Sequence, residues 1–183
     1  MRLILGAALA AVALTGGVMA QQHMGGGMGH MHGADGTGHD MVNMPGLRGA
    51  NATEAESAEL AQMFRYFALL ERSVENLPNG IRTTTRTDDA ELAAVLVSHI
   101  TGMIARVEAK DDPQIFIQSP TLDIFFQRGD QIVTTYEPID GGLIVTQTSD
   151  DPELVVALQT HAAEVSDMAD RGMEAVHARM MRK

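Results

Sequence analysis

Apolar residues recur every three or four positions in long stretches of the chain, and this spacing predicts amphipathic helices. The first stretch, residues 54–75, is followed by a Pro-Asn-Gly breaker at 78–80, and the second spans 89–110. A third stretch runs from residue 151 to about residue 179. The apolar positions of the first stretch are Leu60, Met63, Phe64, Phe67, Leu70 and Val74. Three long helices are therefore expected.

Two shorter stretches, 81–87 and 143–149, contain threonine and other β-branched residues, which favours strands over helices. Each stretch runs into an Asp-Asp-x-Glu sequence. The first aspartate of each sequence, Asp88 or Asp150, is expected to cap the helix that follows. Each predicted strand thus leads directly into a long helix.

The chain also matches itself at a constant shift of 62 residues, since Gly80 then meets Gly142 and His99 meets His161. One copy alone would leave its apolar face exposed. The two copies are therefore expected to pack face to face about an approximate two-fold axis.

These patterns predict a predominantly helical α+β fold, made of two pseudo-symmetric helix-strand-helix repeats at about 53–112 and 115–180. The repeats are expected to form one domain with four main helices and a small antiparallel sheet. Residues 121–137 are the least clear part, because the β-branched run 132–135 favours a hairpin with 143–149. We prefer a helix there, because the matching segment of the first copy has helical periodicity.

Residues 1–20 have the basic start, apolar core and small-residue cleavage site of a secretory signal peptide. Cleavage between Ala20 and Gln21 would release a periplasmic or secreted protein. No later stretch reaches the roughly 18 apolar residues that a membrane span needs. Residues 21–52 are predicted to be a flexible tail rich in Gly, Met and His, and residues 53–183 a single globular domain.

Residues 21–46 hold four of the seven histidines and five of the thirteen methionines, separated by glycine. Thioether and imidazole groups form a soft ligand set that favours copper, above all Cu(I). The candidate ligands are His23, Met24, Met28, His30, Met31, His32, His39, Met41 and Met44. The alternative is a plain flexible linker, although methionine gives a solvated linker no benefit.

The stretch 23–44 resembles the Met/His-rich segments of periplasmic copper- and silver-resistance proteins, which bind these ions through methionine and histidine. The resemblance covers the tail alone and implies metal binding there. The leading hypothesis is therefore an exported copper-binding protein that buffers the ion or passes it to a periplasmic acceptor or donor protein.

His99 and His161 take the same place in the two copies, each on the apolar stripe of a predicted helix. His99 and Met103 share one helix face, so they are candidates to bind a soft metal together with His161. The alternative is that both histidines are core residues with hydrogen-bond partners. A hypothesis of another class is a helical haem carrier, in which His99 or His161 acts with Met63 or Met103 as axial ligands.

A further candidate row lies near the C-terminus, where Met173, His177 and Met180 stand at positions i, i+4 and i+7 of one predicted helix. This Met-His-Met row suits Cu(I). The alternative is a fraying helix end whose methionines cover the margin of the core.

Composition and missing motifs narrow the possible functions. The formal net charge of −11 argues against nucleic acid or an anionic membrane surface as partner. The absence of cysteine excludes disulfides, thiolate metal sites and covalently attached c-type haem. No phosphate loop, zinc-protease motif or nucleophile elbow is present, so we do not expect an enzyme. A third hypothesis is a module that recognises a periplasmic protein and carries an incidental tail.

Overall fold

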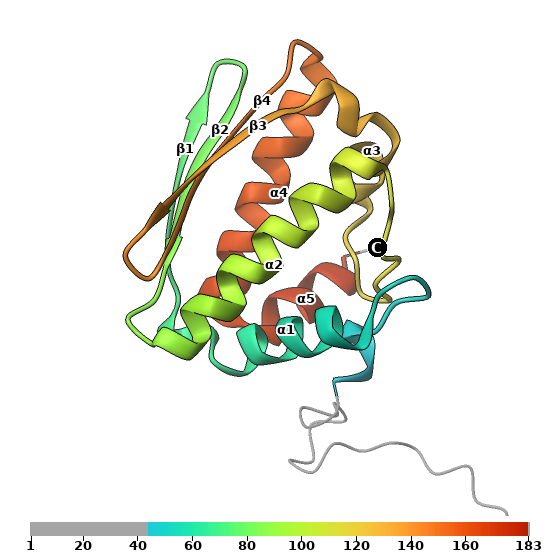
Figure 1. Cartoon of the computed structure of the whole chain (residues 1–183). Coiled ribbons are helices and arrows are strands. Elements are labelled where there is room, and N and C mark those ends of the chain that lie inside the picture. The colour runs from blue at the N-terminus through green and yellow to red at the C-terminus, as the bar shows by residue number, and fades with distance from the viewer. Residues whose placement is uncertain (1–43, 183) are drawn as a thin grey trace, which may run out of the picture. The chain divides into compact units, whose positions relative to one another are not determined.

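The computed structural model describes residues 44–182, so the predicted signal peptide and most of the predicted tail lie outside the described residues (Figure 1). The described part is an α+β fold with five α-helices, where four main helices were predicted, and a four-stranded antiparallel sheet. The predicted α+β class and small antiparallel sheet are thus confirmed. The helices are α1 (Glu54–Arg65), α2 (Ala90–Ala109), α3 (Asp123–Arg128), α4 (Pro152–Arg171) and α5 (Met173–Met180). The strands are β1 (Glu71–Leu77), β2 (Gly80–Arg86), β3 (Val133–Ile139) and β4 (Gly142–Thr148). Short 3-10 helices are η1 (Pro45–Leu47), η2 (Phe67–Leu69), η3 (Pro120–Leu122) and η4 (Gly129–Gln131).

The sheet consists of two hairpins that lie side by side in the strand order β1-β2-β4-β3. Each hairpin closes through a two-residue connection, at 78–79 in the first and at 140–141 in the second. The central strands β2 and β4 pair antiparallel, with Gly80 and Gly142 at opposite ends of the pair. A Cβ atom at either glycine would stand 2.0 Å from a carbonyl oxygen of the neighbouring strand. Glycine at these two positions therefore allows the hairpins to join into one sheet.

The predicted helix over 54–75 is wrong beyond its first half. α1 begins after a capping box formed by Thr53 and Glu56 and ends at Arg65, and Glu71–Leu77 forms β1 instead. Every residue of β1 has a partner in β2. Pairing with an adjacent strand gives the backbone N–H and C=O groups of this segment hydrogen-bond partners. This stabilisation outweighs the helical spacing of the side chains.

The helix preferred for residues 121–137 is also wrong, and the alternative hairpin is present. Only Asp123–Arg128 of this segment is α-helical, whereas Val133–Ile139 pairs along its whole length with β4. The β-branched side chains of 132–135 therefore indicated the local structure correctly. The helix was preferred because the matching segment of the first copy was predicted to be helical. That segment is itself partly a strand, in a hairpin over residues 71–86.

The long helices α2 and α4 are capped one residue later than predicted. Asp89 and Asp151, not Asp88 and Asp150, accept hydrogen bonds from backbone N–H groups of the first helical turn. Pro152 then occupies the first helical position, where its missing N–H costs no hydrogen bond.

The predicted helix from residue 151 to about residue 179 is interrupted at Gly172. This residue has a φ of 58°, in the left-handed region that side chains with a Cβ atom rarely adopt. A Cβ atom there would also stand 2.8 Å from the ring of Phe67. Gly172 therefore ends α4, and α5 begins at Met173.

The helices lie on one face of the sheet, with α1 and α5 across the lower ends of α2 and α4 in Figure 1. α4 packs on β1 and β2, α2 packs on β4, and α1 and α5 pack against α2 and α4 respectively. By length and composition α2, with a mean hydropathy of 1.4, is the one helix of the described chain that could cross a membrane. The buried core cluster consists of Ile81, Phe125, Ile132, Leu154, Leu158 and Ala162.

Candidate functional site

A cavity of about 320 Å³ lies among the sheet, α1, α2, α4, α5 and the segment 113–126. Most of the side chains that line it are aliphatic, aromatic or methionine. Protein interiors are normally close-packed and leave few voids larger than a water molecule. A volume of this size lies at the lower end of the range typical of small-molecule sites, about 300–1,000 Å³. The cavity is therefore the candidate functional site.

The cavity explains why α2 is so apolar and yet only partly buried. Leu92 and Leu96 are the fully buried residues of this helix. Ile100, Met103 and Ile104 are half-buried because they line the cavity and do not contact a neighbouring element on every side. The apolar stripe predicted for this helix thus faces the cavity over much of its length.

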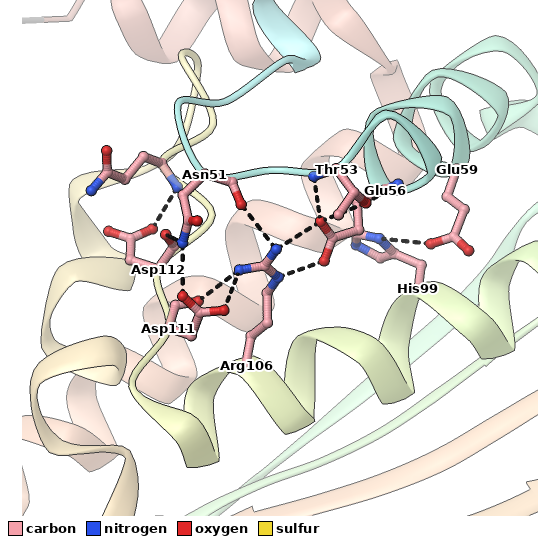
Figure 2. Close-up of polar contacts among 9 residues, drawn as sticks. Asn51, Thr53, Glu56, Glu59, His99, Arg106, Asp111 and Asp112 are labelled. Carbon is pink, nitrogen blue, oxygen red and sulfur yellow. Dashed lines mark hydrogen bonds and ion pairs between the residues drawn. The ribbon is translucent and has the colours of Figure 1, made fainter.

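His99 lines the cavity from the middle of α2, with 17% of its side chain exposed. Its Nδ1 atom is buried and has no hydrogen-bond partner, because the nearest carboxylate oxygen, on Glu59, stands 4.0 Å away (Figure 2). Burial lowers the pKa of His99 to about 4, an effect that the charge of Glu56 opposes and that of His161 reinforces. The imidazole is therefore neutral at neutral pH and can accept a hydrogen bond or bind a metal.

His161 lines the same cavity from α4. Its Nδ1 atom lies 3.7 Å from Oε2 of Glu164, and neither atom has a hydrogen-bond partner among the described residues. The hydroxyl of Ser119 donates to the other oxygen of Glu164 over 2.8 Å. Burial raises the pKa of Glu164, but its contacts with His161 and Ser119 outweigh this effect and lower the pKa. The ring of His161 also meets the ring of Phe125 edge-on at 5.7 Å.

Three methionines, Met63, Met103 and Met168, line the cavity together with these histidines. Met103 lies one turn after His99, and Met63 reaches the cavity from α1. The structure thus places His99, Met103 and His161 around one space, as the helical stripes suggested. Two imidazoles and thioethers beside an apolar space are suitable ligands for Cu(I) or for a haem iron.

A network around Arg106 holds α1 against α2 and thereby fixes one wall of the cavity (Figure 2). The Nε and Nη2 atoms of Arg106 donate to the two carboxylate oxygens of Glu56, and Nη1 donates to Asp111. Nη2 also donates to the carbonyl oxygen of Asn51 over 2.9 Å. The paired guanidinium lowers the pKa of Glu56 to about 2. This fork-to-fork contact ties α1 to the end of α2, and the bond to Asn51 adds the segment before α1.

Arg72 of β1 lines the cavity, and its partners differ from those of Arg106. It stands opposite Thr85 of β2, and its Nη1 atom donates to the threonine hydroxyl over 2.6 Å. Its Nε atom is buried without a hydrogen-bond partner. Burial lowers the pKa of Arg72 to about 10, so the guanidinium remains charged at neutral pH.

The predicted C-terminal row and Met44 do not line this cavity. Met173, His177 and Met180 lie on α5 and are not among the residues that line it, and Met180 is 50% exposed. Met44 of the predicted tail is buried, with 4% exposure. Within residues 44–182 no group of three or more His, Asp and Glu side chains is placed to hold a metal ion. The tail residues His23, Met24, Met28, His30, Met31, His32, His39 and Met41 lie outside the described residues.

Sequence reasoning missed Arg72 and Glu164. Arg72 was not predicted as a site residue because residues 54–75 have the periodicity of a helix. An arginine on such a helix is expected to face solvent. A strand interpretation of 71–77 would have placed Arg72 and Val74 on the same face of the sheet. Glu164 follows His161 by three residues, a helical spacing that brings two side chains together and was available in the sequence.

Comparison of the chain with known protein families, curated proteins and solved structures finds no match.

Proposed function

We propose that the folded domain is a binding domain, not an enzyme, for a small and largely apolar molecule that occupies the cavity. The observation that carries this proposal is the apolar space of about 320 Å³ inside a domain with few fully buried side chains. Apolar walls with a few polar groups are typical of sites for organic ligands. Here the polar groups include His99, His161 and Arg72.

Binding of an apolar probe tests this proposal. N-phenyl-1-naphthylamine, a neutral dye, is expected to gain fluorescence with the wild-type domain. Val165→Trp places a large ring at the cavity wall and is expected to weaken binding at least tenfold. The matched control is Val156→Trp on the same helix, at a position that is 64% exposed. Equal affinity of both variants and the wild type would contradict binding in the cavity.

Haem is one member of this ligand class, and the side chains at the cavity support it as a candidate. His99 and His161 have imidazole nitrogens without partners, and Met63 and Met103 add thioethers. A shifted Soret band on loading with haemin, lost in the His99→Ala/His161→Ala protein, would identify haem as the ligand. An unshifted spectrum that is the same for both proteins would exclude it and leave other apolar ligands.

We also propose a second function, binding of Cu(I) by the tail and by the cavity. The observations that favour it are the Met/His composition of residues 21–46 and the placement of His99, Met103 and His161 around one space. The tail would capture the ion, and the domain would accept or present it to a periplasmic partner after export. The sequence of residues 1–20 supports this location.

Titration with Cu(I) under a competing chelator tests the copper proposal. Three proteins are compared, namely the processed chain, a form lacking residues 21–43, and a His99→Ala/His161→Ala form. The deletion stops before Met44 because this side chain is buried in the domain. We expect the deletion to remove most of the bound copper and the double substitution to remove one ion. If no form binds more tightly than a histidine-free control peptide, the proposal is wrong.

We further propose that the domain arose by internal duplication, with its halves related by an approximate two-fold axis. The bounds of β1, β2 and α2, shifted by 62 residues, coincide with those of β3, β4 and α4. The capping residues Asp89 and Asp151 are related by the same shift. This repetition supports the view that His99 and His161 are equivalent residues.

A further inference from the structure

Arg72 is a half-buried cation that has no acidic partner among the described residues, and its Nε atom is buried. Its only hydrogen bond to the described chain is the one from Nη1 to Thr85. Arg86, a nearby arginine on the sheet, is ion-paired with Glu71 and Asp88. A buried charge is unfavourable unless a counter-charge or hydrogen bonds compensate its lost hydration. The described residues therefore supply one hydrogen bond to Arg72 and no counter-charge.

The charge of the cavity lining points to the nature of that partner. Arg72 and Arg179 line the cavity, whereas none of the described lining residues is an aspartate or glutamate. The carboxylates of Glu59 and Glu164 lie beside the histidines, 4.0 Å from His99 and 3.7 Å from His161, and Glu164 also interacts with the charge of Arg179. The charged side chains that line the cavity, among the described residues, are thus both cationic, although the chain has a formal net charge of −11. An anionic group on the ligand would complement them.

The donors that remain on Arg72 define the shape of this group. Nη1 is used by Thr85, which leaves Nε and Nη2, the two donors on one edge of the planar guanidinium. These parallel donors match the two oxygens of a carboxylate. Thr83, on the same strand face as Thr85, adds a hydroxyl to this polar end of the cavity.

We propose that the cavity binds an apolar monocarboxylate, with the hydrocarbon part among the side chains of α1, α2 and α4 and the carboxylate on Nε and Nη2 of Arg72. This inference rests on the proposed function and specifies its ligand class. A volume of about 320 Å³ suits a single chain or ring system with one acidic group.

Competition between two matched ligands tests the inference. Decanoate and decanol have the same chain and differ in the head group, and each is used to displace N-phenyl-1-naphthylamine from the protein. The wild-type protein is expected to bind decanoate at least tenfold more tightly than decanol at pH 7.5. Arg72→Gln is expected to abolish this preference while the affinity for decanol stays within twofold.

Two further variants control the experiment. Arg82→Gln removes an exposed arginine from β2 and is expected to keep the full preference for decanoate. Arg72→Lys retains the charge without the paired donors, so it is expected to keep only part of the preference. This variant also serves as the test if Arg72→Gln fails to fold.

The possible failures are distinguishable. If the dye binds but the wild-type protein prefers decanol or binds both ligands equally, the carboxylate inference is wrong and the proposed apolar ligand stands. If Arg72→Gln and Arg72→Lys both keep the full preference, Arg72 is not the anchor and the inference is also wrong. If neither the dye nor either ligand binds the wild-type protein, the proposed function is wrong, and so is the inference that rests on it.

Discussion

Gly142→Ala is expected to lower the free energy of unfolding by about 3 kcal/mol, the upper end of the usual cost of overpacking. A Cβ atom at this position would stand 2.0 Å from the carbonyl oxygen of Thr85 in the neighbouring strand. Gly80 has the same relation to the carbonyl oxygen of Gln147, so Gly80→Ala is expected to have a similar effect. Both clashes involve backbone atoms, so the central strands must separate to relieve them. Urea unfolding followed by circular dichroism measures the change.

The same substitution at Gly102 is the matched control. Gly102 lies within α2, and apart from its chain neighbours and the backbone of its own helix, no atom of the described chain comes within 4 Å of a Cβ atom placed there. Alanine is the better helix former, so Gly102→Ala is expected to raise the free energy of unfolding by roughly 0.5–1 kcal/mol. If Gly142→Ala were as stable as the wild-type protein, the close pairing of β2 and β4 would be wrong.

His99→Gln is expected to flatten the dependence of stability on pH. The folded-state pKa of His99 is about 4, against 6.5 for an exposed histidine. Between these values the unfolded chain binds a proton that the folded chain does not, so the stability due to neutral His99 is complete above pH 6.5. It is lost as the pH falls toward 4, and by linkage the loss from pH 7 to pH 5 is about 2 kcal/mol.

Urea unfolding of the metal-free proteins at pH 7, 6 and 5 measures this effect. The range stops at pH 5 because the stabilisation from ionised Glu56, whose pKa is lowered from 4.5 to about 2, is lost only at lower pH. Met103→Leu changes the cavity wall without removing a titratable group, so it is expected to keep the wild-type slope. Parallel pH profiles for the wild-type protein and His99→Gln would show that His99 is not buried as described.

The pattern of apolar residues predicted α2 and the two central strands with small errors. α2 lies within one residue of the predicted 89–110, and β2 and β4 are each displaced by one residue from the predicted 81–87 and 143–149. These elements have strong local signals, namely a capping aspartate or a run of β-branched residues. α4 was overextended to residue 179 because Gly172 interrupts a periodicity that continues on its far side.

The two edge strands could not be predicted from local pattern alone. β1 has apolar residues at a helical spacing, and β3 was assigned to a helix by analogy with it. What decides both segments is the neighbouring strand, since β1 pairs with β2 and β3 with β4. Such pairing depends on contacts between residues that are distant along the chain.

The sequence alone determined the α+β class, the starts of the long helices and the repetition of His99 and His161, because capping and periodicity are local properties of the chain. It also determined the soft-ligand composition of the tail. Only the tertiary structure decided that β1 and β3 are strands and that both histidines meet at one apolar cavity with Arg72. The physical reason is that a cavity and a half-buried charge without a counter-charge exist only between elements, after the sheet and helices have packed.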